Sequence, residues 1–226
     1  MRLVRPILFV FLAAGMVGFR NEETYSLVPK RVKDTVTTYS YTMAFATDEL
    51  DVSMEGKTRI KVLDVAEDGG YELEEASLGG KMKANGMEQE MPAVEPRPQK
   101  YDKHGKRVKK DGDPEEPVMT RVLGEVMEYL PDHAVKMGET WTAETEFGPT
   151  TSKLEGTEKV GDVDCLKITI TAKLEKKDTS GTATSTFYVR ASDFTIEKGS
   201  CTLDHPKFGD EMAPNKMETT IQRIAN

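Results

Sequence analysis

Few residues of this chain have the types and spacings that chemistry requires. The 226-residue sequence contains three histidines, His104, His133 and His205. No two of them have the i, i+4 or short-loop spacing of zinc ligands, and none lies beside a glutamate on a helical stretch. We therefore predict no zinc site and three exposed imidazoles; the alternative is a long-range site that includes Cys165 or Cys201.

The two cysteines would invite a disulfide if the chain enters an oxidising compartment. Consecutive strands are predicted for 162–175, 182–190 and 194–204. The second turn places Cys201 near Ala183, and the first places Cys165 near Ser192. The sulfurs then lie at opposite ends of the sheet, roughly 26 Å apart at about 3.3 Å per residue. Since bonded cysteines need Cα atoms within about 7 Å, we predict that both thiols stay free.

Signals for other catalytic or metal sites are absent or weak. The sequence has no Gly-x-Ser-x-Gly elbow, and Ser200 lies in a predicted strand, where a surface hydroxyl is its simplest role. Asp111-Gly112-Asp113 lacks the spaced ligands and terminal glutamate of a calcium loop. None of the 39 acidic residues stands out as a pair for glycoside chemistry. We predict no catalytic residues, no metal and no cofactor, and therefore a protein that is not an enzyme.

Methionines and basic residues each gather locally. Met82, Met87 and Met91 lie in one segment. Thioether side chains can bind Cu(I), line an apolar pocket that accepts varied ligands, or fill the hydrophobic core, and we favour the last role. Six basic residues fall between Lys100 and Lys110. They form either a polyanion patch or, as we favour, a hairpin with its turn at 103–105, whose lysines discourage edge pairing.

An alternation of apolar and polar residues predicts the elements that must position these groups. It runs through 39–45, 50–62 and 166–174, and turn residues follow at 67–70, 102–105, 178–181 and 191–193. Alternation with period two places one face on a core and the other in water, as in antiparallel sheets. The stretch 91–98, which has three prolines, is the predicted loop.

One segment has a helical period instead. Apolar residues recur every three to four positions over 115–130, Pro117 suits the first turn, and Pro131 stops the helix. This amphipathic helix would join two halves, 24–113 and 132–226. Two interpretations stay open: a pair of structural repeats, or one continuous sheet in a single β-rich domain over 19–226.

The N-terminus is typical of an export signal. Arg2 and Arg5 precede an apolar run of about a dozen residues with small residues after it, which is too short to span a membrane. Cleavage after Gly15 or Gly18 is expected, with an uncleaved anchor as the alternative; Met16 stands where a lipoprotein needs cysteine. Loss of residues 1–18 removes two arginines and changes the net charge from −8 to −10, which disfavours nucleic acid as a partner.

Three stretches carry a resemblance to known proteins: 134–141 (AVKMGETW), 154–168 (LEGTEKVGDVDCLKI) and 186–189 (TFYV). They resemble exported bacterial β-rich domains of unknown function over roughly 33–225. More distantly, the plan is similar to the lipoprotein and lipid carriers of the LolA and LppX type. In those carriers a curved antiparallel sheet wraps an apolar cavity beneath helices.

The resemblance implies a mainly β fold, a long curved antiparallel sheet or half-barrel with one helix laid across it. From the export signal, its short apolar run and Met16, we expect a soluble protein, periplasmic or secreted and not a lipoprotein, that has no stable membrane insertion after signal cleavage. One function is then binding of a lipid or a lipid-anchored envelope partner between helix and sheet, and the other is protein interaction through sheet edges or the basic hairpin. An enzyme is the third and least favoured alternative. The carrier resemblance implies a cavity near Leu123, Val126, Met127, Tyr129 and Trp141.

Overall fold

The computed structural model describes residues 23–108, 122, 130–131, 133–208 and 213–224. The predicted signal peptide, residues 1–18, lies outside them, and so does the predicted helix 115–130 except for Val122 and Leu130. Val122 is fully buried in the hydrophobic core, and Leu130 is half-buried against it. The segment between the two predicted halves therefore meets the core at these two residues.

The described residues form thirteen strands and confirm the mainly β prediction. Their bounds are β1 Thr24–Tyr25, β2 Val36–Ala46, β3 Asp51–Val65, β4 Tyr71–Ala84, β5 Met87–Met91, β6 Arg97–Tyr101, β7 Val135–Lys136, β8 Thr140–Glu144, β9 Pro149–Val160, β10 Val163–Leu174, β11 Thr179–Arg190, β12 Ile196–Phe208 and β13 Lys216–Ile224.

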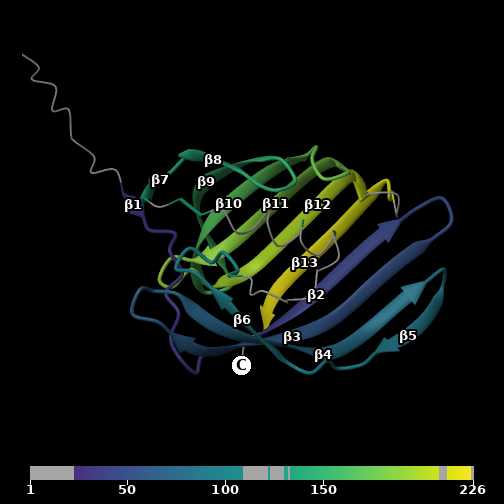
Figure 1. Cartoon of the computed structure of the whole chain (residues 1–226), viewed down its shortest axis with the longest axis horizontal. Coiled ribbons are helices and arrows are strands. Elements are labelled where there is room, and N and C mark those ends of the chain that lie inside the picture. Colours follow the sequence, from purple (N-terminus) through teal and green to yellow (C-terminus); the bar gives the residue numbers. More distant parts are fainter. Residues whose placement is uncertain (1–22, 109–121, 123–129, 132, 209–212, 225–226) are drawn as a thin grey trace, which may run out of the picture.

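Eleven of these strands build one long, curved antiparallel sheet (Figure 1). Its order is β5-β4-β3-β2-β13-β12-β11-β10-β9-β8, with β6 also paired to β4, and the sheet is not closed into a barrel. Strands β2–β6 form one side, β8–β12 form the other, and β13 joins them by pairing with β2 and β12. The division into halves 24–113 and 132–226 stays a prediction. A separate two-stranded sheet pairs β1 with β7.

Side-chain alternation explains why these segments are strands and which face they bury. In β10 the residues Leu166, Ile168 and Ile170 are buried, whereas Thr171 and Lys173 between the buried positions are exposed. Burial of each large aliphatic side chain stabilises the fold by about 1.5–3 kcal/mol. We call the buried side the core face and the polar, solvated side the outer face.

The core face is continuous across seven strands because the registers align its side chains in rows. One row, from β9 to β3, consists of Leu154, Ile168, Phe187, Gly199, Ile221, Tyr41 and Gly56. The outer face is held by polar pairs such as the Thr42 and Thr220 hydroxyls, 2.7 Å apart. The two faces thus differ sharply in chemistry.

Most predicted turns lie where strands reverse. The basic segment is a hairpin, as favoured: Gly105 N donates to Asp102 O at 3.1 Å, and Tyr101 pairs with Arg107. The sequence analysis missed the two-residue turn at Asn85-Gly86, which joins β4 to β5 with φ values of 47° and 84°. Asn-Gly is the commonest signal for such a turn, because both positions need positive φ.

The predicted meander of β10, β11 and β12 is confirmed, with a register two residues from the predicted one. Cys165 pairs with Arg190 in place of Ser192, and Cys201 pairs with Ser185 in place of Ala183. Both thiols are free, as predicted, because the two pairs lie five residues apart along β11, about 17 Å. Irregularities in the β11–β12 ladder, at Ser180/Thr182 and Tyr188/Val189, account for part of the shift.

Candidate functional site

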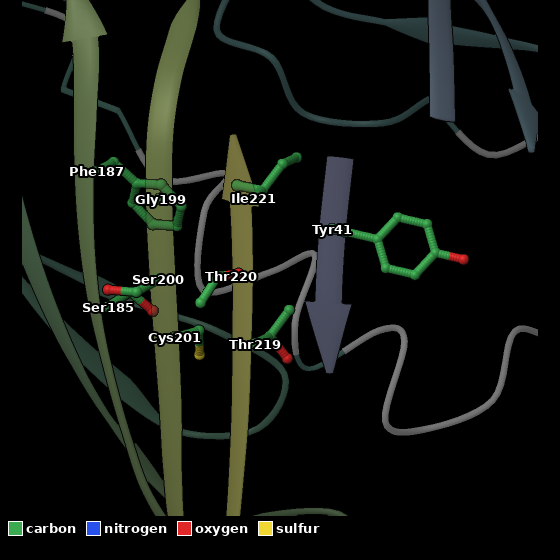
Figure 2. Close-up of a pocket in the computed structure, with 9 residues that line it drawn as sticks. All are labelled: Tyr41, Ser185, Phe187, Gly199, Ser200, Cys201, Thr219, Thr220 and Ile221. Carbon is green, nitrogen blue, oxygen red and sulfur yellow. The ribbon is translucent and has the colours of Figure 1, made fainter. Parts of the chain in front are cut away.

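An apolar pocket lies in the middle of the core face. Its volume is about 170 Å³, and the surface that lines it is almost entirely apolar. Figure 2 shows the lining residues, which come from β11, β12, β13 and β2. They are Tyr41, Ser185, Phe187, Gly199, Ser200, Cys201, Thr219, Thr220 and Ile221.

Small side chains at the centre of the sheet produce this hollow. Gly199 separates Phe187 from Ile221 in one row, and in the next row Cys201 lies between Ser185 and Thr219. Four of these six positions therefore carry little volume, in a region where a β core normally places large apolar residues. The pocket is built by composition and needs no break in the strands.

Two aromatic rings bound the pocket by leaning over glycines. A Cβ atom on Gly199 would lie 2.6 Å from Cδ1 of Phe187 and 2.9 Å from Cγ2 of Ile221. On β2, the Tyr41 ring leans in the same direction across the sheet, toward β3, so that a Cβ on Gly56 would be 2.6 Å from its hydroxyl oxygen. Figure 2 shows the Phe187 ring over Gly199 and the Tyr41 ring turned away from Ile221. Because the Tyr41 ring leans away from Ile221, it leaves the space beside Ile221 open.

The few polar atoms of the pocket have little to bind. The Thr219 Oγ1 atom is buried and has no hydrogen-bond partner among the described residues. Burial raises the pKa of the Cys201 thiol, and the neighbouring Ser185 hydroxyl opposes this effect only in part. A thiol held in its neutral form is a poor nucleophile.

A row of methionines continues the apolar surface away from the pocket. Thr219 pairs with Met43, Met43 with Met54, and Met54 with Met82, on β13, β2, β3 and β4. These three methionines are half-buried, whereas Met87 is 75% exposed. Flexible thioether side chains adapt to irregular apolar partners.

Of the five residues implied by the carrier resemblance, Leu123, Val126, Met127 and Tyr129 lie outside the described residues. Trp141 lies in β8, pairs with Ser152 and packs, partly buried, against the core. It does not line the described pocket, although successive pairings place it in the same row as Cys201. A cavity at these five residues stays a prediction.

The sequence analysis did not single out the pocket residues as a site. Phe187, Cys201 and Ile221 read as ordinary positions of alternating strands. The usable signal was Gly199, because a glycine on the buried face of a strand marks a close approach or a gap.

The histidines and acids do not gather into a metal site. Among the described residues, no group of three or more histidine, cysteine, aspartate or glutamate side chains is placed to hold an ion. His133 and His205 are exposed and lie beside single carboxylates, at 2.8 Å from Glu139 and 3.1 Å from Asp204. His104 differs from the prediction: it is half-buried with an inaccessible Nδ1, because its hairpin turn packs beside Tyr71.

No helix within the described part of the chain is both long and apolar enough to cross a membrane.

Comparison with known proteins places the chain in no family. No family model and no curated protein matches it. Among solved structures, a DUF1329 family protein from Desulfovibrio piger is 12% identical, with a TM-score of 0.26 and 84% of each chain covered. A putative outer membrane lipoprotein-sorting protein domain from Vibrio parahaemolyticus is 10% identical, with a TM-score of 0.23, covering 84% of this chain and 83% of that one. Scores this low do not establish a shared fold, and neither protein's role is transferred to this chain.

Proposed function

We propose that this protein is an exported, non-enzymatic envelope protein that binds a lipid, or the lipid part of an anchored partner, on the core face of its sheet. The observation that carries the proposal is the apolar pocket between Phe187, Ile221 and Cys201. Natural cores are close-packed, with few voids larger than a water molecule. An apolar hollow of about 170 Å³ in the middle of a sheet is therefore a binding site more readily than a packing defect.

The volume limits what the pocket holds. Apolar cavities of about 150 Å³ bind a molecule the size of benzene. The pocket therefore accepts roughly six carbons of an acyl chain, worth at most about 5 kcal/mol at about 0.8 kcal/mol per buried methylene. That free energy corresponds to a dissociation constant of roughly 0.3 mM. A longer chain would gain affinity by continuing over Met43, Met54 and Met82, which lie on the adjoining row.

A matched pair of variants tests the pocket. Cys201→Leu fills it from the floor, whereas Thr202→Leu adds a leucine at the next residue, whose side chain lies on the outer face. We expect the neutral fluorescent probe N-phenylnaphthylamine to bind the wild type and Thr202→Leu alike, and Cys201→Leu about tenfold more weakly, since a lost contact of about 1.4 kcal/mol has that effect.

Native mass spectrometry after mild extraction gives the second measurement. Co-purified lipid that is lost in Cys201→Leu and kept in Thr202→Leu would support the proposal. A lipid-free protein that also fails to bind the probe would contradict it. That result would favour the other class, an interaction module that uses its sheet edges.

A further inference from the structure

A buried charge cluster lies one step along the strands from the pocket. Ile221 lines the pocket, and Arg223 follows it on the same face of β13, about 7 Å further on. The Arg223 Nη1 group donates to Glu197 Oε1 at 3.0 Å, and the Arg190 Nε group donates to the same oxygen. The side chain of Glu197 is only 10% exposed. Two guanidinium groups thus share one buried carboxylate.

A third arginine joins this cluster around Tyr39. Tyr39 is the partner of Arg223 on β2 and is 5% exposed. Burial raises the pKa of its phenol, while the positive charges of Arg31 and Arg223 lower it and the acids Glu197 and Asp193 raise it. The segment of Arg31 lies beside Asp193, because the Lys30 backbone N–H donates to the Asp193 backbone oxygen at 3.1 Å.

Arg31 comes from the segment before β2, and its guanidinium lies 5.4 Å from the centre of the Tyr71 ring. With Arg190, the cluster contains three positive and two negative groups, an excess of one positive charge.

Two N–H donors of this cluster lack a hydrogen-bond acceptor in the described part of the chain. The Nε atoms of Arg31 and Arg223 are buried and have no acceptor among the described residues. Asp193 Oδ1 accepts from the backbone N–H of Thr195 at 2.8 Å, and Asp193 accepts from neither of these Nε atoms. A buried guanidinium N–H without an acceptor is costly, and its planar fork suits a carboxylate or a phosphate.

We propose that Arg31, Arg190 and Arg223 bind the oxyanion head group of an amphiphile whose chain enters the apolar pocket. The inference rests on the proposed lipid-binding function and adds its ligand class, a fatty acid or a phospholipid-like anion. Chain and head would be recognised on neighbouring rows of one sheet, the chain at Ile221 and the head at Arg223. The carboxylate and the phosphate ester share this chemistry, so binding measurements must separate them.

Three ligands with the same chain provide the test: decanoate, decyl phosphate and decanol, each measured by displacement of N-phenylnaphthylamine. Arg31→Gln is the main variant, because Glu197 keeps both of its arginine partners when Arg31 is removed. Arg223→Gln is the second. Arg59→Gln is the control, since it removes one positive charge from a side chain that is 45% exposed and pairs loosely with Glu74 at 4.0 Å.

We expect the wild type to bind at least one of the two anions about tenfold more tightly than decanol. Arg31→Gln and Arg223→Gln should reduce that preference to about twofold or less and leave decanol binding unchanged, while Arg59→Gln changes neither. The anion that wild type prefers identifies the head group as carboxylate or phosphate.

Different results would overturn different statements. Equal wild-type affinity for anions and decanol would refute the head-group site, and so would an anion preference that survives in Arg31→Gln. A wild type that binds neither decanol nor the fluorescent probe would refute the pocket itself. Circular dichroism of each variant identifies unfolded protein, and Arg31→Gln keeps the test decisive if Arg223→Gln does not fold.

Discussion

Replacement of Gly199 by alanine should change ligand binding more than stability. The added Cβ would lie 2.6 and 2.7 Å from Cδ1 and Cε1 of Phe187 and 2.9 Å from Cγ2 of Ile221, so at least one side chain must move. Both neighbours are side chains, and an open volume of about 170 Å³ lies beside them. The Phe187 ring can therefore rotate into this open volume, and it would then fill the pocket.

The size of the stability change follows from two opposing effects. Replacing a strand glycine by alanine gains about 0.5–1 kcal/mol of backbone entropy. Overpacking costs typically about 1–3 kcal/mol. Because the ring can pivot into the pocket, the cost should be at the low end, about 1 kcal/mol, and we expect a net destabilisation of at most about 0.5 kcal/mol. Binding of N-phenylnaphthylamine should fall by about tenfold or more, since the pivoted ring fills the site.

Gly80→Ala is the comparison that tests this reasoning. A Cβ on Gly80 would lie 2.1 Å from the backbone carbonyl oxygen of Glu55, and no side-chain rotation relieves that contact. We expect it to cost about 3 kcal/mol or more, measured by urea unfolding of both variants at unchanged m-value. Equal destabilisation by the two substitutions, or full probe binding by folded Gly199→Ala, would show that the Phe187 ring does not move into the pocket.

Three further predictions concern single groups. Thr219→Val should raise the free energy of unfolding by about 1 kcal/mol, because it removes a buried hydroxyl that has no partner among the described residues. Thr220→Val should not raise it, because the Thr220 hydroxyl is hydrogen-bonded to that of Thr42. Urea unfolding of both variants measures the difference. The Lys136 backbone N–H, followed by His133, lowers the pKa of Glu139 below its ordinary value of 4.5, so its contribution to stability is complete above pH 4.5 and disappears as pH falls through the lowered pKa. In Glu139→Gln the free energy of unfolding should therefore depend less on pH below pH 4.5 than in the wild type. Near neutral pH, the difference in unfolding free energy between the two proteins should not change with pH. The intact mass should be the same before and after reduction, since a gain of two hydrogens would require a bridge that the strand register forbids.

The strands and their faces could be predicted because each is a local property. Period-two alternation identified the core-face positions. In β3, Val52 and Val62 are buried and Met54 and Ile60 are half-buried, and in β10 every second residue from Leu166 to Leu174 is buried. Alternation does not say which strands are neighbours. The pairing of Met217 with Phe45, which joins β13 to β2, depends on the whole fold and left no local signal.

The site was harder to predict than the fold for a related reason. The pocket depends on the direction in which Phe187 and Tyr41 lean, and the charge cluster depends on a bulge that brings Glu197 under Arg223. Neither is encoded by residue type alone. Irregularities in the β11–β12 ladder also account for part of the two-residue change in the cysteine register. The conclusion that both thiols stay free did not depend on that change.

The position of β13 has a consequence for how the molecule assembles. This strand follows all others in the sequence, yet it lies between β12 and β2 in the sheet. Until Lys216–Ile224 is available, β2 and β12 each present an unpaired edge. Open edges of that length invite pairing with other chains, and closure across so long a sequence separation is slow. The chain is therefore most vulnerable to aggregation until β13 pairs with both β12 and β2, because that pairing joins the two parts of the sheet.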